Sequence, residues 1–582
     1  MHSSLRQRTT RAAFALLCAT LATAPLTAHG GRYWAPVPTI SLPPAPPGTG
    51  ARTPTITPGV NPLTPPNVPG GMSPTGPFTN SWENWWELNY EWVLSPRTRA
   101  PREQVGDGPT TSPHGTRIPS RELVRDRVLP VLRAHLKDSD AEVRSAAAMA
   151  LGKTLLREVE PELIALLDDP ERDVREGALL GLGLLRTPVA QQTLLARFAD
   201  TKRTTRERAF SAAALGLLGS SACLQALLDA LDPLAAGKKE GRTVQAAALL
   251  GLAAGASTAT LPRLMPWVEG QAFQDDMIGA LACSVLGRIG DRTAIPAVEK
   301  ALLSKEGRIR QGACFALASL AKPTDSALLK KLEHVAREDA LEDVRAFAWL
   351  ALGRIGGEPA RALLRKELSD SRSAVELGYA SLGLGFCGNP DLDGPRLARE
   401  RVERGGDVNL RAAAAIAIGI LGAKGQANVL AREMASNQNR DFATGLILGL
   451  GLLRADSAAK ALLANVARER APEVLRASII SLGLLDHADL IETVSERLAR
   501  ERSSVLRGAG AQGLGTVMDA RHLDTVLALL ASKKPVSELR VVLIIALGRM
   551  AEAQDLPALS ALRRDLWFQS DDAVIQELLS IL

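Results

Sequence analysis

The feature that most constrains the fold is a pattern that recurs along most of the chain. From Arg121 onward, an apolar segment, a short acidic or proline-containing turn and a second segment rich in Ala, Leu and Gly follow one another repeatedly. Each second segment carries a Leu-Gly pair or a close equivalent, and these anchors lie 30 to 36 residues apart. Self-similarity at this period is typical of a solenoid, in which each unit buries its apolar face against the next. The anchors begin at Leu151, Leu182, Leu215, Leu250, Leu286, Leu317, Leu352, Leu384, Ile418, Leu448, Leu482, Leu514 and Leu547.

The second segment of each unit has helical spacing. In "DSDAEVRSAAAMALG", Val143, Ala147 and Leu151 fall on one face of a helix, and Asp140 precedes them where an N-cap belongs. A fourteenth unit is expected to stop at the last residue, because Val574 stands eight residues before Leu582 as Val143 stands before Leu151. The pattern therefore predicts an all-α chain over residues 121–582, built as a right-handed α-α superhelix of about 14 helix pairs.

Glycine is frequent inside these second helices. Gly177, Gly181 and Gly183 fall within a single unit, although each glycine costs a helix about 1 kcal/mol relative to alanine. Small residues let neighbouring helices approach closely and gain dispersion contacts, which offsets this cost. We therefore expect the second helices to form a tightly curved inner row.

Arginine stands seven residues before the anchor in eight of the units. A long cation with an acidic turn ahead of it can bridge to carboxylates or carbonyls there, and stacking would arrange such arginines as a ladder. The same residues are candidates for contact with a partner, although a role within the repeats is the favoured interpretation. The eight are Arg144, Arg175, Arg208, Arg310, Arg345, Arg411, Arg507 and Arg540.

The repeated frame, x-D-x-x-V-R-x-x-A-x-x-x-L-G with two helices per unit, resembles the HEAT repeat. It is most similar to the short form found in phycobilin-lyase-type proteins, and the resemblance covers about 460 of the 582 residues. The resemblance implies the fold but says little about function. The Trp-Leu-Gly-Tyr pattern of tetratricopeptide repeats and the Thr-Pro-Leu-His of ankyrin repeats are both missing.

The first 28 residues have the features of a secretory signal peptide. Arg6, Arg8 and Arg11 precede an apolar run over 12–21, and small residues follow up to Ala28. The alternative, a membrane anchor, is disfavoured because the run is about half of the roughly 20 residues that a spanning helix needs. We expect export to the periplasm or the cell exterior, and removal of this segment would reduce the formal charge from +6 to about +3.

Two segments of low complexity surround a short aromatic one. Residues 29–78 contain fourteen prolines among Gly, Ser and Thr and are predicted to form a disordered tether. Residues 96–120 are expected to be a polar linker.

The aromatic segment, residues 79–95, includes "SWENWWELNYEW" and is predicted to be an amphipathic helix. Its aromatic face could dock on the protein's own solenoid, bind a partner or an aromatic-stacking ligand such as a glycan, or lie on a membrane. Acidic residues on the opposite face disfavour the membrane. The segment resembles an N-terminal element of exported bacterial HEAT-repeat proteins, which implies no particular activity. The residues of the face are Trp82, Trp85, Trp86, Asn89 and Trp92.

No motif indicates reaction chemistry. The seven histidines are scattered, and the His-Glu pairs that hold iron in deoxyhypusine-type hydroxylases have no counterpart in this sequence. "GAGAQG" at 508–513 lies within a predicted helix and not after a strand, which argues against a dinucleotide site. For Cys283 and Cys314, buried free thiols are favoured over a disulfide. We therefore expect no metal and no cofactor, and the sequence favours a non-catalytic protein without deciding the question.

The expected function follows from the architecture. A solenoid offers a long concave surface, so the sequence favours an exported scaffold that binds protein partners. Basic and acidic residues are interleaved, which argues against nucleic acid as a partner. Two alternatives remain open: a structural envelope component without a discrete partner, and a lyase-type enzyme built on the same repeats.

Overall fold

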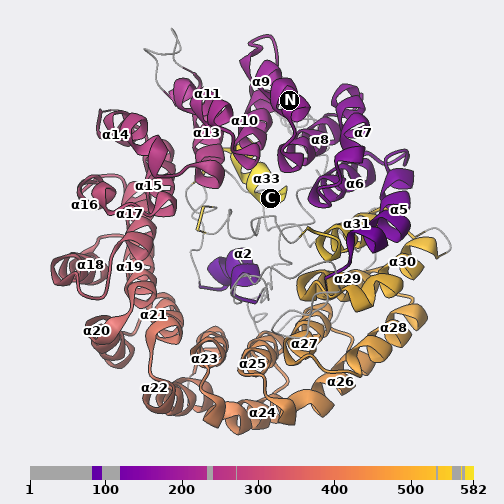
Figure 1. Ribbon diagram of the computed structural model, residues 1–582. Coiled ribbons are helices and arrows are strands. Elements are labelled where there is room, and N and C mark those ends of the chain that lie inside the picture. The colour runs from indigo at the N-terminus through magenta and orange to yellow at the C-terminus, as the bar shows by residue number, and fades with distance from the viewer. Residues whose placement is uncertain are drawn as a thin grey trace, which may run out of the picture.

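The computed structural model describes residues 82–94, 118–231, 240–270, 272–404, 406–532, 535–553, 565–566 and 570–581. The predicted signal peptide, the proline-rich tether and most of the polar linker lie outside these ranges. Within them, all regular secondary structure is helical, and tandem helix pairs form a solenoid, as the repeat pattern predicts (Figure 1).

Each unit of the solenoid has an outer and an inner helix (Figure 1). The outer helices are α5 (Leu129–His135), α7 (Glu160–Ala165), α9 (Pro188–Ala199), α11 (Ser221–Leu231), α14 (Leu261–Gly270), α16 (Ile295–Leu302), α18 (Ser326–Glu338), α20 (Gly357–Asp370), α22 (Pro390–Leu397), α24 (Ala427–Ser436), α26 (Ala459–Arg468), α28 (Leu490–Arg500) and α30 (Leu523–Ala531). The inner helices are α6 (Ala141–Lys153), α8 (Arg172–Leu185), α10 (Thr205–Leu218), α13 (Arg242–Gly255), α15 (Asp276–Ile289), α17 (Gly307–Leu320), α19 (Glu342–Ile355), α21 (Ala374–Cys387), α23 (Val408–Leu421), α25 (Arg440–Leu453), α27 (Pro472–Leu485), α29 (Ser504–Val517) and α31 (Ser537–Met550).

Short helical segments complete several outer helices. Arg121–Leu123 (α4) and a π-helical stretch, Val124–Val128, lead directly into α5. A second π-helical stretch, Ala398–Glu403, extends α22. Single 3₁₀ turns precede or follow outer helices at Arg157–Val159, Leu166–Asp168, Thr258–Thr260, Ala272–Gln274, Arg292–Ala294, Lys424–Gln426, Asp456–Ala458 and Ala520–His522.

The inner helices begin where the acidic turns place an N-cap. The Asp140 side chain accepts a hydrogen bond from the Glu142 N–H at 2.9 Å, which satisfies a donor that the first turn of a helix leaves unpaired. Thr204 and Asp275 cap α10 and α15 in the same manner. The anchor Leu151 is completely buried.

Glycine allows the inner helices to pack almost backbone to backbone. A Cβ atom added to Gly152 would lie 2.6 Å from the carbonyl oxygen of Gly181 on the next inner helix. Gly216 meets Gly251, and Gly353 meets Gly383, in the same close manner. The small residues near the anchors therefore set the spacing of the inner row, as the sequence predicts.

The solenoid closes on itself. The last inner helix, α31, packs on the first, α6, so the thirteen pairs that the described residues form close into a ring (Figure 1). Arg540 Nη2 donates to Asp138 Oδ1 at 3.0 Å, and the Ala553 N–H donates to the Lys153 carbonyl at 3.0 Å. The outer layer is joined too, by an ion pair between Arg127 and Asp524 at 2.5 Å. Every inner helix thus has an inner-helix neighbour on each side.

The end of the chain differs from the expected fourteenth repeat. Residues 573–581 do form a helix, α33 (Ala573–Ile581), but it does not stack after α31, because α6 already occupies that position. Instead α33 lies inside the ring, against α10 and α13 (Figure 1). A second helix, α2 (Trp82–Leu94), also lies in the centre of the ring.

The core also contains buried thiols and a small cavity. Cys283 and Cys314 are buried free thiols, and burial raises the pKa of Cys283 to about 12. A small cavity of about 20 Å³ lies at the junction of α6 and α31, where Met149, Gly548 and Ile581 are among its lining residues. This volume corresponds to about one water molecule.

Candidate functional site

The inner wall of the ring, formed by the thirteen inner helices, carries the most distinctive chemistry of the molecule. It holds two segments, α2 and residues 565–566 and 570–581, and we call the second the C-terminal strap (Figure 1). Both segments contact residues of the wall that are distant from them in the sequence.

The aromatic face of α2 is buried against α21 and α23. Trp85 is completely buried, and Trp82, Trp86 and Asn89 each expose 5% or less of their surface. Gly378 makes room for Trp82, because a Cβ atom there would lie 2.8 Å from its Cγ. This is the arrangement that the first of the three interpretations, docking on the protein's own solenoid, describes.

Rings and cations of the wall receive the aromatic side chains. Trp85 makes an edge-on contact with Tyr379, with ring centroids 6.4 Å apart. Trp92, which is half-buried, stacks on Phe386 at 5.6 Å, and the Arg354 guanidinium lies 5.5 Å from the Trp92 ring. Such stacked and cation–π contacts add to the gain from burial.

Asp565 joins α2, the strap and the wall. Its carboxylate accepts a hydrogen bond from Trp85 Nε1 at 3.2 Å and forms a buried ion pair with Arg354. Its backbone N–H donates to Asn89 Oδ1 at 3.1 Å, while Asn89 Nδ2 donates to the Trp85 carbonyl. A single buried carboxylate therefore couples both ends of the described chain to α19.

The strap continues along the wall by ion pairs and apolar contacts. Arg242 Nη1 lies 2.7 Å and Arg308 Nη1 3.0 Å from carboxylate oxygens of Asp571, and Thr243 Oγ1 donates to Asp572 Oδ2 at 2.6 Å. Burial would raise the pKa of Asp571, but hydrogen bonds and charge from the two arginines outweigh it and lower that pKa.

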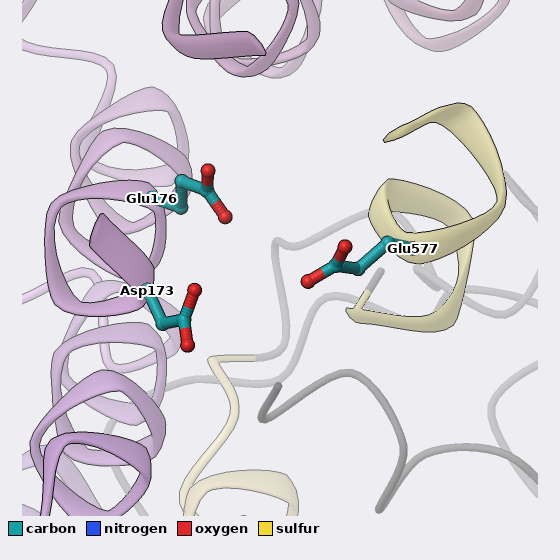
Figure 2. A group of neighbouring side chains, drawn as sticks. All are labelled: Asp173, Glu176 and Glu577. Carbon is teal, nitrogen blue, oxygen red and sulfur yellow. The ribbon is translucent and has the colours of Figure 1, made fainter. Parts of the chain in front are cut away.

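Three carboxylates meet where α33 faces α8. Asp173 and Glu176 project from α8 toward Glu577 of the strap (Figure 2), and one oxygen from each lies within 4.8 Å of the others. Carboxylate oxygens are ligands for hard cations such as Ca²⁺. However, Arg206 Nη2 lies 2.7 Å from Glu176 and 2.7 Å from Glu577. The group is therefore explained as an ion-pair network around Arg206.

Burial and charge oppose each other in this network. Burial of Glu176 raises the pKa of its carboxyl, and the charges of Glu577 and Asp173 add to this effect, whereas Arg206 lowers it. Burial also acts to lower the pKa of Arg206, but its two carboxylate partners outweigh burial and raise that pKa. The arginine remains charged, and it holds the strap to α8 and α10.

The aligned arginines act mainly within and between repeats. Arg144 donates to the Asp138 carbonyl at 2.9 Å and pairs with Asp169 of the next repeat at 3.0 Å. Arg310 makes the same two kinds of contact, with the Ser304 carbonyl and with Asp339. The contacts of the others are Arg175 with the Asp169 and Pro170 carbonyls, Arg208 with the Phe198 carbonyl and Glu240, Arg345 with the Asp339 carbonyl and Glu376, and Arg411 with the Val402 carbonyl and Glu433.

Arg540 and Arg507 depart from this pattern in opposite ways. Arg540 contacts the Pro535 carbonyl, but the acid it reaches is Asp138 of the first repeat, so it carries the series of contacts across the closed ring. Arg507 makes no side-chain hydrogen bond or ion pair among the described residues, and its buried Nε, like that of Arg540, has no hydrogen-bond partner there. Position within the repeat therefore does not alone determine the role of an aligned arginine.

The residues that hold the strap are absent from the sequence-based candidates. They are Arg206, Arg242, Arg308, Arg354, Asp565, Asp571 and Glu577. Two signals were present: Arg206 and Arg308 each stand two residues before an aligned arginine, and residues 565–582 contain four acids and no Lys, Arg or His. Neither signal shows that the chain end returns to the inner wall.

A buried histidine just before the last outer helix, α30, makes the stability of the fold depend on pH. His522 exposes 1% of its surface, and its Nδ1 has no hydrogen-bond partner in the described part of the chain. Burial lowers its pKa from 6.5 to about 4, with Asp519 opposing and Arg521 supporting this effect. The folded state therefore favours the neutral ring.

We expect stability to fall on acidification because of His522. Since the pKa is lower in the folded state, the contribution is fully present above about pH 6.5 and is lost as the pH falls from 6.5 toward 4. The loss should reach roughly 3 kcal/mol, because one pKa unit corresponds to about 1.4 kcal/mol. Urea unfolding at pH 7.5, 5.5 and 4.5 measures it. The control is His522→Gln, which cannot titrate, and an equally steep decline in that variant would contradict the assignment.

Comparison with known proteins agrees with the architecture. A family model for HEAT repeats matches residues 129–214. No protein of curated function matches the sequence. Among the described helices, none combines the length and the apolar character needed to cross a membrane.

Three solved structures are among those that are similar to this chain. The CpcE–CpcF complex of phycocyanin lyase from Nostoc is 21% identical, with 45% of this chain and 94% of that chain covered and a TM-score of 0.29. Human deoxyhypusine hydroxylase is 18% identical, with 52% of this chain and 98% of that chain covered and a TM-score of 0.20. Importin beta is 14% identical, with 78% of this chain and 68% of that chain covered and a TM-score of 0.37. At these values the similarities carry no functional argument. The family match over residues 129–214 and the thirteen stacked helix pairs of the described residues show that the chain is built of HEAT-like repeats.

Proposed function

We propose that this protein is an exported, non-catalytic scaffold that binds a protein partner through the inner wall of its ring. The observation that carries the proposal is that this wall already binds polypeptide: it receives α2 through stacked rings and the strap through arginine–carboxylate pairs. A surface with both kinds of contact is suited to segments of other proteins, because aromatic residues and arginine contribute most to protein interfaces.

Export is part of the proposal and rests on the N-terminal sequence. Basic residues, a short apolar run and small residues up to Ala28 favour cleavage after that position. Cell fractionation with intact-mass measurement tests this. A chain that begins at His29 in the envelope or secreted fraction supports export, whereas a full-length chain in the cytoplasm overturns it.

Site-specific photo-crosslinking in the native envelope fraction tests the scaffold role. A photoreactive residue replaces Gln512, a half-buried residue of inner helix α29, and in a matched control it replaces Lys330, an exposed residue of outer helix α18. We expect one protein adduct from the first position and none from the second. An adduct from Lys330 alone would place the interface on the outer layer and contradict the proposal.

A structural envelope component is the second candidate, and the closed ring favours it. Because α31 packs on α6 and the centre holds α2 and α33, the ring needs no further polypeptide to complete its fold. Adducts from neither position would support this structural role. A pigment that co-purifies with the protein would instead support a lyase-type activity.

A further inference from the structure

The strap meets a row of arginines on the inner wall. Arg354, Arg308, Arg242 and Arg206 come from α19, α17, α13 and α10, and these helices follow one another around the ring with only α15 between α17 and α13 (Figure 1). Asp565 pairs with Arg354, Asp571 with Arg308 and Arg242, and Glu577 with Arg206. The strap therefore runs against the order of the repeats, with an acid on the arginine row every six residues.

We propose that this arginine row is a binding site for an acidic segment of another protein, and that the chain's own strap occupies the site when that segment is absent. The proposal rests on the proposed function and deepens it by naming the chemistry of the partner. That segment carries carboxylates about six residues apart, followed by a short helix with apolar residues. The strap itself has this character, since residues 565–582 hold four acids and no basic residue.

The apolar side chains of the strap define its register on the wall. Ile575, Leu578 and Leu579 of α33 expose 1% or less of their surface, and Ile581 lines the cavity between α6 and α31. A competing segment therefore needs apolar residues beyond its second acid, and acidity alone is insufficient.

The ion pairs in the middle of the strap are open to exchange. The Arg242 and Asp571 side chains expose 38% and 32% of their surface, and Arg308 exposes 25%. Pairs this exposed contribute little net stability, because water and salt compete for both partners. A segment with the same charges can therefore exchange with the middle of the strap, but to displace the whole strap it must also replace the buried Asp565–Arg354 pair and the apolar contacts of α33.

Competition within the full-length chain tests the proposal. The probe is a fluorescein-labelled peptide of residues 565–582, and its binding is followed by fluorescence anisotropy. We expect weak binding to the wild-type chain, whose own strap occupies the wall. The double variant Asp571→Asn/Glu577→Gln should bind the probe at least tenfold more tightly, because its weakened strap competes less, and a charge-assisted hydrogen bond accounts for about a tenfold change.

Matched changes show whether the arginine row is the site. On the double-variant background, Arg308→Ala should weaken binding by about two- to fivefold, the range for a partly exposed ion pair. Arg263→Ala, which removes a pair between outer helix α14 and Asp229 of α11, should leave binding unchanged. A probe carrying Asp571→Asn should bind more weakly on the intact wall but lose little on a wall that carries both Arg242→Ala and Arg308→Ala, because both arginines pair with Asp571. This non-additivity identifies the contact between Asp571 and the two arginines directly. Circular dichroism confirms that each variant is folded.

The outcomes separate this proposal from the scaffold role. Equal probe binding by the wild type and the double variant, or binding that Arg308→Ala does not weaken, overturns the arginine row as a peptide site. If crosslinks from Gln512 persist in that case, the scaffold role stands and its partner binds elsewhere on the wall. Probe binding without any crosslinked partner would leave the row as a peptide site and overturn the scaffold role.

Discussion

Replacing Trp85 by alanine is expected to cost about 3–5 kcal/mol in the docking of α2, the usual range when a large buried aromatic residue is truncated. Trp85 is completely buried, contacts the ring of Tyr379 and donates a hydrogen bond to Asp565. The substitution therefore opens a cavity and also removes one partner of a buried carboxylate. We expect a lower melting temperature and rapid proteolytic loss of the N-terminal segment.

Trp92→Phe is the matched control for this prediction. Trp92 is half-buried and stacks on Phe386, and a phenyl ring preserves much of that contact. Melting of this variant should stay close to that of the wild type. Deletion of residues 79–95 should destabilise at least as much as Trp85→Ala. If the deletion variant melts like the wild type, α2 does not stabilise the ring.

The repeat itself was predictable because its physical causes are local. The 30–36-residue period, the N-cap at Asp140 and the small residues near each anchor all act within one unit or between neighbours. A contact such as Gly152 against Gly181 recurs once per repeat, so the sequence presents the same signal many times. Thirteen partial repetitions of a pattern determine a fold that one copy would not.

Closure of the ring was not predictable, because it depends on a sum of small rotations. Each inner helix turns slightly relative to the next, and only the accumulated angle decides whether α31 reaches α6. No residue in a single unit encodes that total. Arg540 illustrates this: its repeat position is ordinary, yet its acidic partner is Asp138, 402 residues away.

The path of the chain end was missed for a related reason. Val574 and Leu582 follow the repeat spacing, and local spacing alone predicts a fourteenth unit there. Because α6 already covers the free side of α31, that stacking position is filled, and α33 buries its apolar face on the inner wall instead. Competition between two distant segments for one surface is invisible in the local pattern.

Closure also changes what α2 is for. An open solenoid needs capping units, because its terminal helices would otherwise expose apolar faces. In the ring, α6 and α31 cap each other, and the aromatic helix covers α21 and α23 in mid-chain. Its burial therefore reflects an affinity of the inner wall for aromatic side chains, which is the property that the proposed scaffold role requires.

Glycine-to-alanine changes in two inner helices should have opposite effects. At Gly353 an added Cβ would lie 2.6 Å from the Gly383 carbonyl carbon on the next inner helix, so neighbouring helices must separate. Overpacking of this kind costs about 1–3 kcal/mol or more. Because the contact is with backbone, which cannot move aside as a side chain can, we expect a cost at the upper end of this range. At Gly508 nothing lies within 4 Å of the added atom, and Gly508→Ala should gain up to about 1 kcal/mol from helix propensity. Urea unfolding of both variants measures the difference. Equal stability would show that the inner row tolerates wider spacing and that glycine does not set the curvature that closes the ring.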